Sequence, residues 1–219
     1  MLKLYHDPIS ANSRRVWITL IEKGLDFKLI EVNLDGEQFT PAFQAMNPFS
    51  HIPVLVDCET TVIESLAILD YLEAQYPIPA LMPAAPKDLA IVRMVEMATV
   101  NELFPAMNPL IAKLLGLMND EAAAEQSTQK IHRALTWFEQ QLGDRAYFGS
   151  ETLTLADIVA GTSILFVPML GMELNHYAKL QAWLDRLVMR SSWKESDQPI
   201  TPEVLEKVKT RMKARIGQH

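Results

Sequence analysis

The sequence has a single cysteine, Cys58, and no long uninterrupted run of apolar residues. One cysteine excludes an internal disulfide and a dithiol redox pair. Charged residues interrupt every apolar stretch before about 18 residues, which is too short for a membrane-spanning helix. The first residues, MLKLYHDP, lack the apolar core of a secretory signal. We therefore expect a cytoplasmic protein that does not insert into a membrane.

Positive charge is also scarce, since 20 Lys and Arg stand against 27 Asp and Glu, for a formal net charge of −7. This balance argues against nucleic acid or an anionic membrane surface as the main partner. The first 80 residues hold five basic and eleven acidic side chains, while the remainder is close to neutral. With 49% hydrophobic residues, the 219-residue chain can form two compositionally distinct domains.

The first 77 residues read as strands alternating with helices. The β-type runs are LKLYH, FKLIEV, PVLVD and TTVI, and the last two are expected to form a hairpin that turns at residues 58–60. The helical runs are RRVWITLIEKG, which stops at Gly24, and SLAILDYLEAQY, with Ser65 where an N-cap belongs. This order predicts a small open sheet with helices on its faces.

Four prolines between residues 77 and 86 predict a linker. After it, apolar residues follow a helical period over 87–118, 121–142, 155–170, 177–190 and 202–215. Pro105 and Pro109 predict a kink or break in the first of these helices. Thr154 and Asp157, in TLAD, form a capping-box sequence. We expect an α/β domain over 1–77, a linker over 78–86 and an all-helical domain over 87–219.

Two features of the first domain suggest ligand chemistry. Pro53 begins an apolar strand, and a cis bond after Ile52 would leave the Ile52 backbone free to pair with an extended peptide-like ligand. Glu64 and Ser65 stand at a helix N-terminus, where unpaired amides favour a carboxylate and Glu64 can accept from an ammonium. Together these groups suit an α-amino-acid end. The residues alone leave Ser65 open to the simpler interpretation of a helix cap.

Four segments, PISANSRRV, PAFQAMNPFSHIPVL, IESLAILDYL and LTLADI, carry a family resemblance through their order and spacing. The chain resembles the soluble glutathione transferases of the serine-type, bacterial-like kind over its whole length. The resemblance implies a thioredoxin-like N-terminal domain, an all-α helical C-terminal domain, and a homodimer. It also implies that Pro53 is cis and that the Ile52 backbone pairs with the cysteinyl part of glutathione.

The same resemblance assigns the two ends of glutathione. Glu64 and Ser65 match the pair that holds the γ-glutamyl end. His51 matches a position near the glycyl end, and Gln38 matches a polar residue that reaches the glycyl carboxylate in the plant-type classes. The segment EQFTPAF departs from the more basic segment of those classes.

Conjugation needs the glutathione thiolate, and an ordinary thiol with a pKa of about 8.5 is little ionised at neutral pH. A hydroxyl that donates to the sulfur at a helix N-terminus stabilises the thiolate. In the serine-type classes the catalytic serine precedes an Arg-Val pair by five residues, as Ser10 does here. The resemblance therefore assigns catalysis to Ser10. Asn12 is a secondary candidate, and two alternatives stay open: Ser10 acts alone, or it shares the work with Asn12. Ser13 is expected to cap the helix, and Tyr5, the rival, to pack.

The remaining polar candidates have simpler interpretations. Arg14 is expected to be solvated and Arg15 to pair with an acid. Cys58 falls in the hairpin turn, which argues against the cysteine-using classes. His132 and His176 have no metal-ligand partner at useful spacing, so no metal site is expected.

The second substrate is expected to meet an apolar wall of the helical domain. Methionine and phenylalanine suit a site that accepts several shapes. The candidates are Phe104, Met107, Met118 and Phe166, whereas the helical spacing of Met94 and Met97 is more typical of a core.

The sequence thus predicts a glutathione transferase that conjugates the glutathione thiolate to small apolar electrophiles, with glutathione as co-substrate and no other cofactor. One alternative is a glutathione-dependent peroxidase or isomerase, although the isomerase-like class has SSC where this chain has SAN. The other is a non-catalytic ligand-binding or interaction protein of the same fold.

Overall fold

The structure, a computed structural model, describes residues 1–216, with side chains described through residue 213. It divides into two units: Met1–Leu81 together with Ser191–Pro199, and Met82–Arg190 together with the rest of the C-terminal part. The segment 191–199, placed with the helical domain from the sequence, therefore belongs to the first unit. The expected domain end at residue 219 lies outside the described residues.

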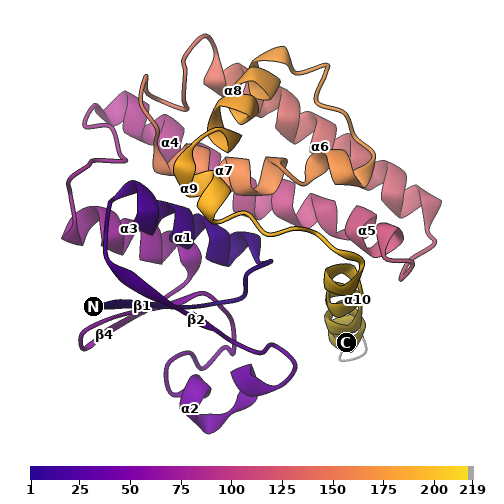
Figure 1. The fold of residues 1–219 in the computed structure, drawn as a ribbon. Helices are drawn as coiled ribbons and strands as arrows, with labels where there is room; N and C mark the ends of the chain where they lie inside the picture. The colour runs from indigo at the N-terminus through magenta and orange to yellow at the C-terminus, as the bar shows by residue number, and fades with distance from the viewer. Residues whose placement is uncertain (217–219) are drawn as a thin grey trace. The chain divides into compact units, whose positions relative to one another are not determined.

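The first unit is built on a four-stranded sheet in the order β2-β1-β3-β4 (Figure 1). β1 (Leu2–His6) runs parallel to β2 (Phe27–Glu31) and antiparallel to β3 (Val54–Asp57), and β3 forms a hairpin with β4 (Thr60–Ile63). The predicted strands and hairpin are confirmed.

Two helices cover one face of this sheet and a short helix covers the other. α1 (Ala11–Glu22) and α3 (Ser65–Gln75) contact each other on one face, and α2 (Pro41–Gln44) lies on the opposite side (Figure 1). Successive side chains of β1 point to opposite faces of the sheet. Leu4 is fully buried, and the next residue, Tyr5, packs in a cluster with Phe43 of α2. The predicted open sheet with helices on its faces is thus confirmed.

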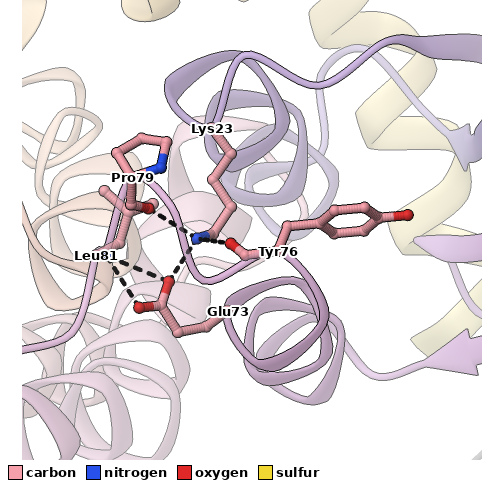
Figure 2. A network of polar contacts seen from close by, with 5 residues as sticks. All are labelled: Lys23, Glu73, Tyr76, Pro79 and Leu81. Atoms are coloured by element: carbon pink, nitrogen blue, oxygen red, sulfur yellow. Dashed lines mark hydrogen bonds and ion pairs between the residues drawn. The ribbon is translucent and has the colours of Figure 1, made fainter.

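The buried ammonium of Lys23, at the end of α1, binds the last turns of α3 and the segment 76–81 that follows α3 (Figure 2). Lys23 Nζ lies 2.6 Å from Glu73 Oε2 and donates to the carbonyl oxygens of Tyr76 and Pro79 at 2.8 and 3.0 Å. The Glu73 carboxylate also accepts from the Leu81 N–H at 3.0 Å. The Lys23 side chain is 0% exposed, so its charge is tolerated only because these partners surround it.

The second unit is made of helices. They are α4 (Pro86–Ala98), α5 (Phe104–Leu114), α6 (Glu121–Leu142), α7 (Leu155–Ile164), α8 (Ala178–Val188) and α10 (Pro202–Ile216), whereas α9 (Ser191–Glu195) lies in the first unit. The expected break is present just before Pro105, since a π-helical turn over Thr99–Leu103 separates α4 from α5, whereas Pro109 lies inside α5. The predicted helix 155–170 ends at Ile164, and a 3₁₀ turn covers Val167–Leu170. No helix within residues 1–216 combines the length and the apolar character that crossing a bilayer requires.

α7 lies at the centre of the second unit's core, because all of its residues are buried. Its predicted capping box is confirmed: the Asp157 carboxylate accepts from the backbone N–H of Thr154 at 2.7 Å. The same carboxylate accepts from the Phe148 N–H at 2.9 Å and from Trp183 Nε1–H at 2.8 Å. Burial raises the pKa of Asp157 to about 6, and these hydrogen bonds oppose the rise. One side chain thus fastens α7 to α8 and to the preceding turn.

Candidate functional site

Three chain segments leave the sheet of the first unit at the same edge. β1 pairs Tyr5 with Val54 at the start of β3, and Val54 pairs with Ile63 at the end of β4. The turn that enters α1, the stretch before β3 and the start of α3 therefore meet at this edge, which we call the α1–α3 edge (Figure 1). The N-termini of two helices lie here, and both favour negative charge.

Ser10 is the N-cap of α1, and its hydroxyl oxygen accepts from the Ser13 N–H at 3.3 Å. Its carbonyl oxygen accepts from the Arg14 N–H at 2.8 Å. The expectation that Ser13 caps this helix is wrong, because Ser13 lies inside the first turn and its hydroxyl accepts from the Asp7 N–H at 3.4 Å. Among the described residues nothing accepts from the Ser10 O–H. The Ser10 proton therefore remains available to a ligand.

The two arginines that follow are both buried, and the expectation that Arg14 is solvated is wrong. Arg14 is 7% exposed and forms an ion pair with Asp197 at 3.1 Å. Burial lowers the pKa of Arg14, and Asp197 opposes this. Arg15 is 0% exposed, and its Nη1 donates to Ser65 Oγ at 3.4 Å. Arg15 thereby joins α1 to the first residue of α3 and adds positive charge to the α1–α3 edge.

The peptide bond between Ile52 and Pro53 is cis. Neither the N–H nor the carbonyl of Ile52 forms a hydrogen bond within the described part of the chain. These two groups offer main-chain pairing to an extended ligand, as a sheet edge does.

Asn47 shapes the loop before this bond, and the sequence reasoning missed it. Its amide donates to the His51 carbonyl at 2.8 Å and its side-chain oxygen accepts from the Phe49 N–H at 3.0 Å, while the residue is 0% exposed. The local signal was the Asn-Pro pair, because Asn side chains commonly bond to the backbone two residues on.

The start of α3 has an unusual backbone. The N-cap is Glu64, with φ of +66° and no side-chain capping bond, so the expectation of Ser65 at the N-cap is wrong. Ser65 is the first helical residue, is 9% exposed, and its hydroxyl accepts from Arg15. In the described residues the N–H groups of Ser65, Leu66 and Ala67 have no acceptor. Backbone strain of the kind seen at Glu64 concentrates at functional sites, and unpaired amides at a helix N-terminus are donors of the kind that bind carboxylates.

The other predicted glycyl-end residues differ in availability. His51 is exposed beside the cis bond. Gln38 is 8% exposed, and its amide is used within its own loop, donating to the Leu34 carbonyl at 2.8 Å and accepting from the Gly36 N–H at 3.1 Å. Gln38 is thus seen holding a loop, and its part in ligand binding stays a prediction.

The rival and helper residues near Ser10 also have clear positions. Asn12 is half-buried in the first turn of α1, where its side chain forms no hydrogen bond with any described residue. Tyr5 packs against the Phe43 cluster, as expected for a core residue. Cys58 is exposed in the turn between β3 and β4, at the opposite end of those strands from the α1–α3 edge.

The candidates for the second substrate lie in the second unit. Met107 is 1% exposed and belongs to the core, while Phe104, Met118 and Phe166 are half-buried. Met94 and Met97, expected in the core, are each 46% exposed, so that expectation is wrong. Within the described residues there is no group of three or more metal-ligating side chains, and His132 Nδ1 lies 2.8 Å from the Tyr177 hydroxyl.

Known protein families match most of the chain. Residues 4–81 match the family described as glutathione S-transferase, N-terminal domain, and residues 71–191 match glutathione S-transferase, C-terminal domain. Glutathione S-transferase F10 of Arabidopsis thaliana is 32% identical over 206 residues, covering 89% of this chain and 96% of the relative. Maleylacetoacetate isomerase of Rattus norvegicus is 31% identical, covering 90% and 93%.

Solved structures agree with this likeness. The theta-class glutathione S-transferase from the citrus canker pathogen Xanthomonas axonopodis pv. citri, determined with glutathione bound, superposes with a TM-score of 0.82 at 26% identity, covering 91% of this chain and 99% of that one. A delta-class glutathione transferase from Nilaparvata lugens gives a TM-score of 0.82 at 27% identity over 98% and 99%. A thioredoxin-like sheet unit followed by a helical unit defines the fold class. The chain belongs to the glutathione S-transferase family.

Proposed function

We propose that this protein is a glutathione transferase that binds glutathione at the α1–α3 edge and stabilises its thiolate through Ser10. The observation that carries the proposal is the state of Ser10. Its hydroxyl oxygen is fixed by the Ser13 N–H, and its proton has no acceptor among the described residues. A donor fixed in this way at a helix N-terminus favours the charged sulfur over the neutral thiol.

The other groups at the edge suit the rest of the tripeptide. The unpaired N–H and carbonyl of Ile52, next to the cis bond to Pro53, pair with the cysteinyl backbone. The free amides of α3 and the Ser65 hydroxyl take the γ-glutamyl carboxylate, and Glu64 accepts from its ammonium. His51 lies toward the glycyl end. The thiolate then attacks an apolar electrophile, for which the half-buried Phe104, Met118 and Phe166 remain the proposed contacts. Met107, predicted with them, is buried in the core and is not proposed as a contact.

Replacing Ser10 by Ala tests the assignment. A charge-assisted hydrogen bond contributes about 2 kcal/mol, so kcat/KM at neutral pH should fall about 30-fold while the Kd for glutathione changes little. The thiolate absorbance of the glutathione complex should titrate at a higher pH than in the wild type. Asn12→Ala tests the predicted helper in the same assay, with an expected loss of less than threefold. Unchanged turnover and thiol pKa in Ser10→Ala would reject Ser10 as the activating group.

A second activity is favoured by one observation, the 31% identity with a maleylacetoacetate isomerase. Reversible addition of the same thiolate to a double bond would isomerise a substrate without consuming glutathione. A panel of aryl halides, isothiocyanates, hydroperoxides and cis-dienoic acids separates conjugation, peroxide reduction and isomerisation. Binding of apolar ligands without turnover of any of them would instead favour a carrier.

The proposal includes a cytoplasmic location, where reduced glutathione is abundant, and a homodimer. Light scattering coupled to size exclusion measures the mass of the assembly directly. A particle of 24.7 kDa would exclude the dimer under those conditions.

A further inference from the structure

The side chain of Arg14 fastens α1 to a segment nearly 180 residues further along the chain. Its Nη2 donates to the Trp193 carbonyl at 3.1 Å and pairs with Asp197, while its Nε donates to Ser196 Oγ at 3.3 Å. The guanidinium also lies 5.6 Å from the centre of the Trp193 ring. The planar fork of arginine suits this set of partners, and an ammonium cannot reproduce it.

A second contact holds the same segment at the other end of α1. The Ser192 hydroxyl donates to the Glu22 carboxylate. Ser192, Trp193 and Ser196 are each at most 1% exposed, so the segment Ser191–Pro199 is packed into the first unit. Arg14 and Glu22 are eight residues apart, or about 12 Å along a helix. We call Ser191–Pro199 the α1 splint.

Arg14, which the α1 splint anchors, is bonded directly to the N-cap residue Ser10. The Arg14 N–H donates to the Ser10 carbonyl at 2.8 Å, and the preceding N–H, that of Ser13, donates to Ser10 Oγ. Both oxygens of Ser10 are therefore fixed by two successive residues, and the second of these is anchored through its own side chain.

We propose that the α1 splint, acting through Arg14, is a positioning device that holds the Ser10 hydroxyl in the geometry needed to stabilise a bound thiolate. The inference rests on the proposed function, because it assumes that Ser10 donates to the glutathione sulfur. Arg14 itself does not touch the reacting atoms in this account.

Geometry rather than net charge carries the effect. Asp197 is 64% exposed, so its ion pair is screened by water and contributes little. The bonds to Trp193 and Ser196 are buried and directional. Loss of directionality weakens a hydrogen bond steeply, so a small displacement of the first turn costs thiolate stabilisation without unfolding the unit.

The test uses Arg14→Lys, which keeps the charge and loses the fork, and Ser196→Ala, a milder change that removes one acceptor from the anchor. The readout is the pKa of the glutathione thiol in the complex, measured by thiolate absorbance, together with the pH profile of kcat/KM. Arg14→Lys should raise that pKa by about 1 unit. At pH values below the thiol pKa, kcat/KM should then be about tenfold lower than in the wild type, and the difference should disappear at higher pH. Ser196→Ala should cause a loss of about threefold in the same direction.

Ser192→Ala is the matched control, because it loosens the splint at Glu22 and leaves the Ser10 end anchored. Its thiol pKa should equal the wild-type value even if its melting temperature falls. In the Ser10→Ala background, Arg14→Lys should have no further effect on the thiol pKa. An additive effect there would mean that Arg14 acts on the thiol by a route that does not pass through Ser10, and this would overturn the inference.

The thiol pKa values of these variants distinguish failure of the positioning role from failure of the proposed function. If Ser10→Ala leaves the thiol pKa unchanged, the proposed function fails. If Ser10→Ala raises the pKa while Arg14→Lys and Ser196→Ala leave it unchanged, the positioning role alone fails.

Discussion

Replacing Lys23 by Met should strongly destabilise the first unit. The substitution keeps an unbranched apolar stem about as long as that of lysine and removes the ammonium that contacts Glu73 and the carbonyls of Tyr76 and Pro79. Breaking a buried ion pair costs about 3 to 5 kcal/mol. The cost should lie at the lower end, about 3 kcal/mol, because Glu73 is 17% exposed and keeps the Leu81 N–H as a donor. The unfolding constant should then rise by roughly two orders of magnitude.

Urea unfolding followed by tryptophan fluorescence measures this loss as a lower midpoint at an unchanged slope. Glu73→Gln keeps an acceptor for Leu81 and removes the negative charge. The double variant Lys23→Met with Glu73→Gln should lose less than the sum of the two single losses, because no unpaired carboxylate is left. A loss below about 1 kcal/mol for Lys23→Met would refute the reasoning that the ammonium holds these helix ends together.

Two further perturbations follow from backbone and charge. Gly149 has φ of +69°, and an added Cβ would lie 2.7 Å from the Asp88 carbonyl oxygen, so Gly149→Ala should cost about 3 kcal/mol in thermal unfolding. Gly116→Ala, at φ of +67° with open space around it, should cost only about 1 kcal/mol, and equal losses would contradict the clash. Burial lowers the pKa of His6, against the opposing charge of Glu31, so the folded state binds the His6 proton less readily than the unfolded chain. The stability that neutral His6 contributes is present above pH 6.5 and is lost as the pH falls through the lowered pKa of the folded state. The free energy of unfolding of His6→Phe should therefore fall less than that of the wild type between pH 7.5 and 5.5. Identical pH dependences of that free energy in the two proteins would refute the assignment.

Much of the fold was predictable because its signals are local. The strands, the hairpin, the proline break and the capping box at Asp157 each follow from a few neighbouring residues. The segments that carry Ser10, Pro53 and Glu64 were likewise recognisable from the sequence as candidate ligand-binding segments, and they meet at the α1–α3 edge.

The errors fall where local rules were ambiguous or absent. Ser10 and Ser13 are both competent caps three residues apart, and which one caps depends on where the chain leaves β1. At α3 the cap is Glu64 with positive φ, a conformation that its residue type does not signal. Arg14 was expected in solvent because its partners lie about 180 residues away in the sequence, where no local pattern links them to α1. Trp193 lies on a five-residue helix too short to show a period, and Ser196 and Asp197 follow that helix.

The discontinuity of the first unit has a consequence for biosynthesis. Trp193 and Ser196 are synthesised about 180 residues after Arg14, the residue that they anchor. At about 5 to 20 residues per second, the guanidinium waits roughly 10 to 40 s for its partners. During that interval the sheet and its helices can form, but the N-terminal turn of α1 lacks its final anchor. The first unit is therefore completed only after the intervening residues Met82–Arg190 of the second unit have been translated.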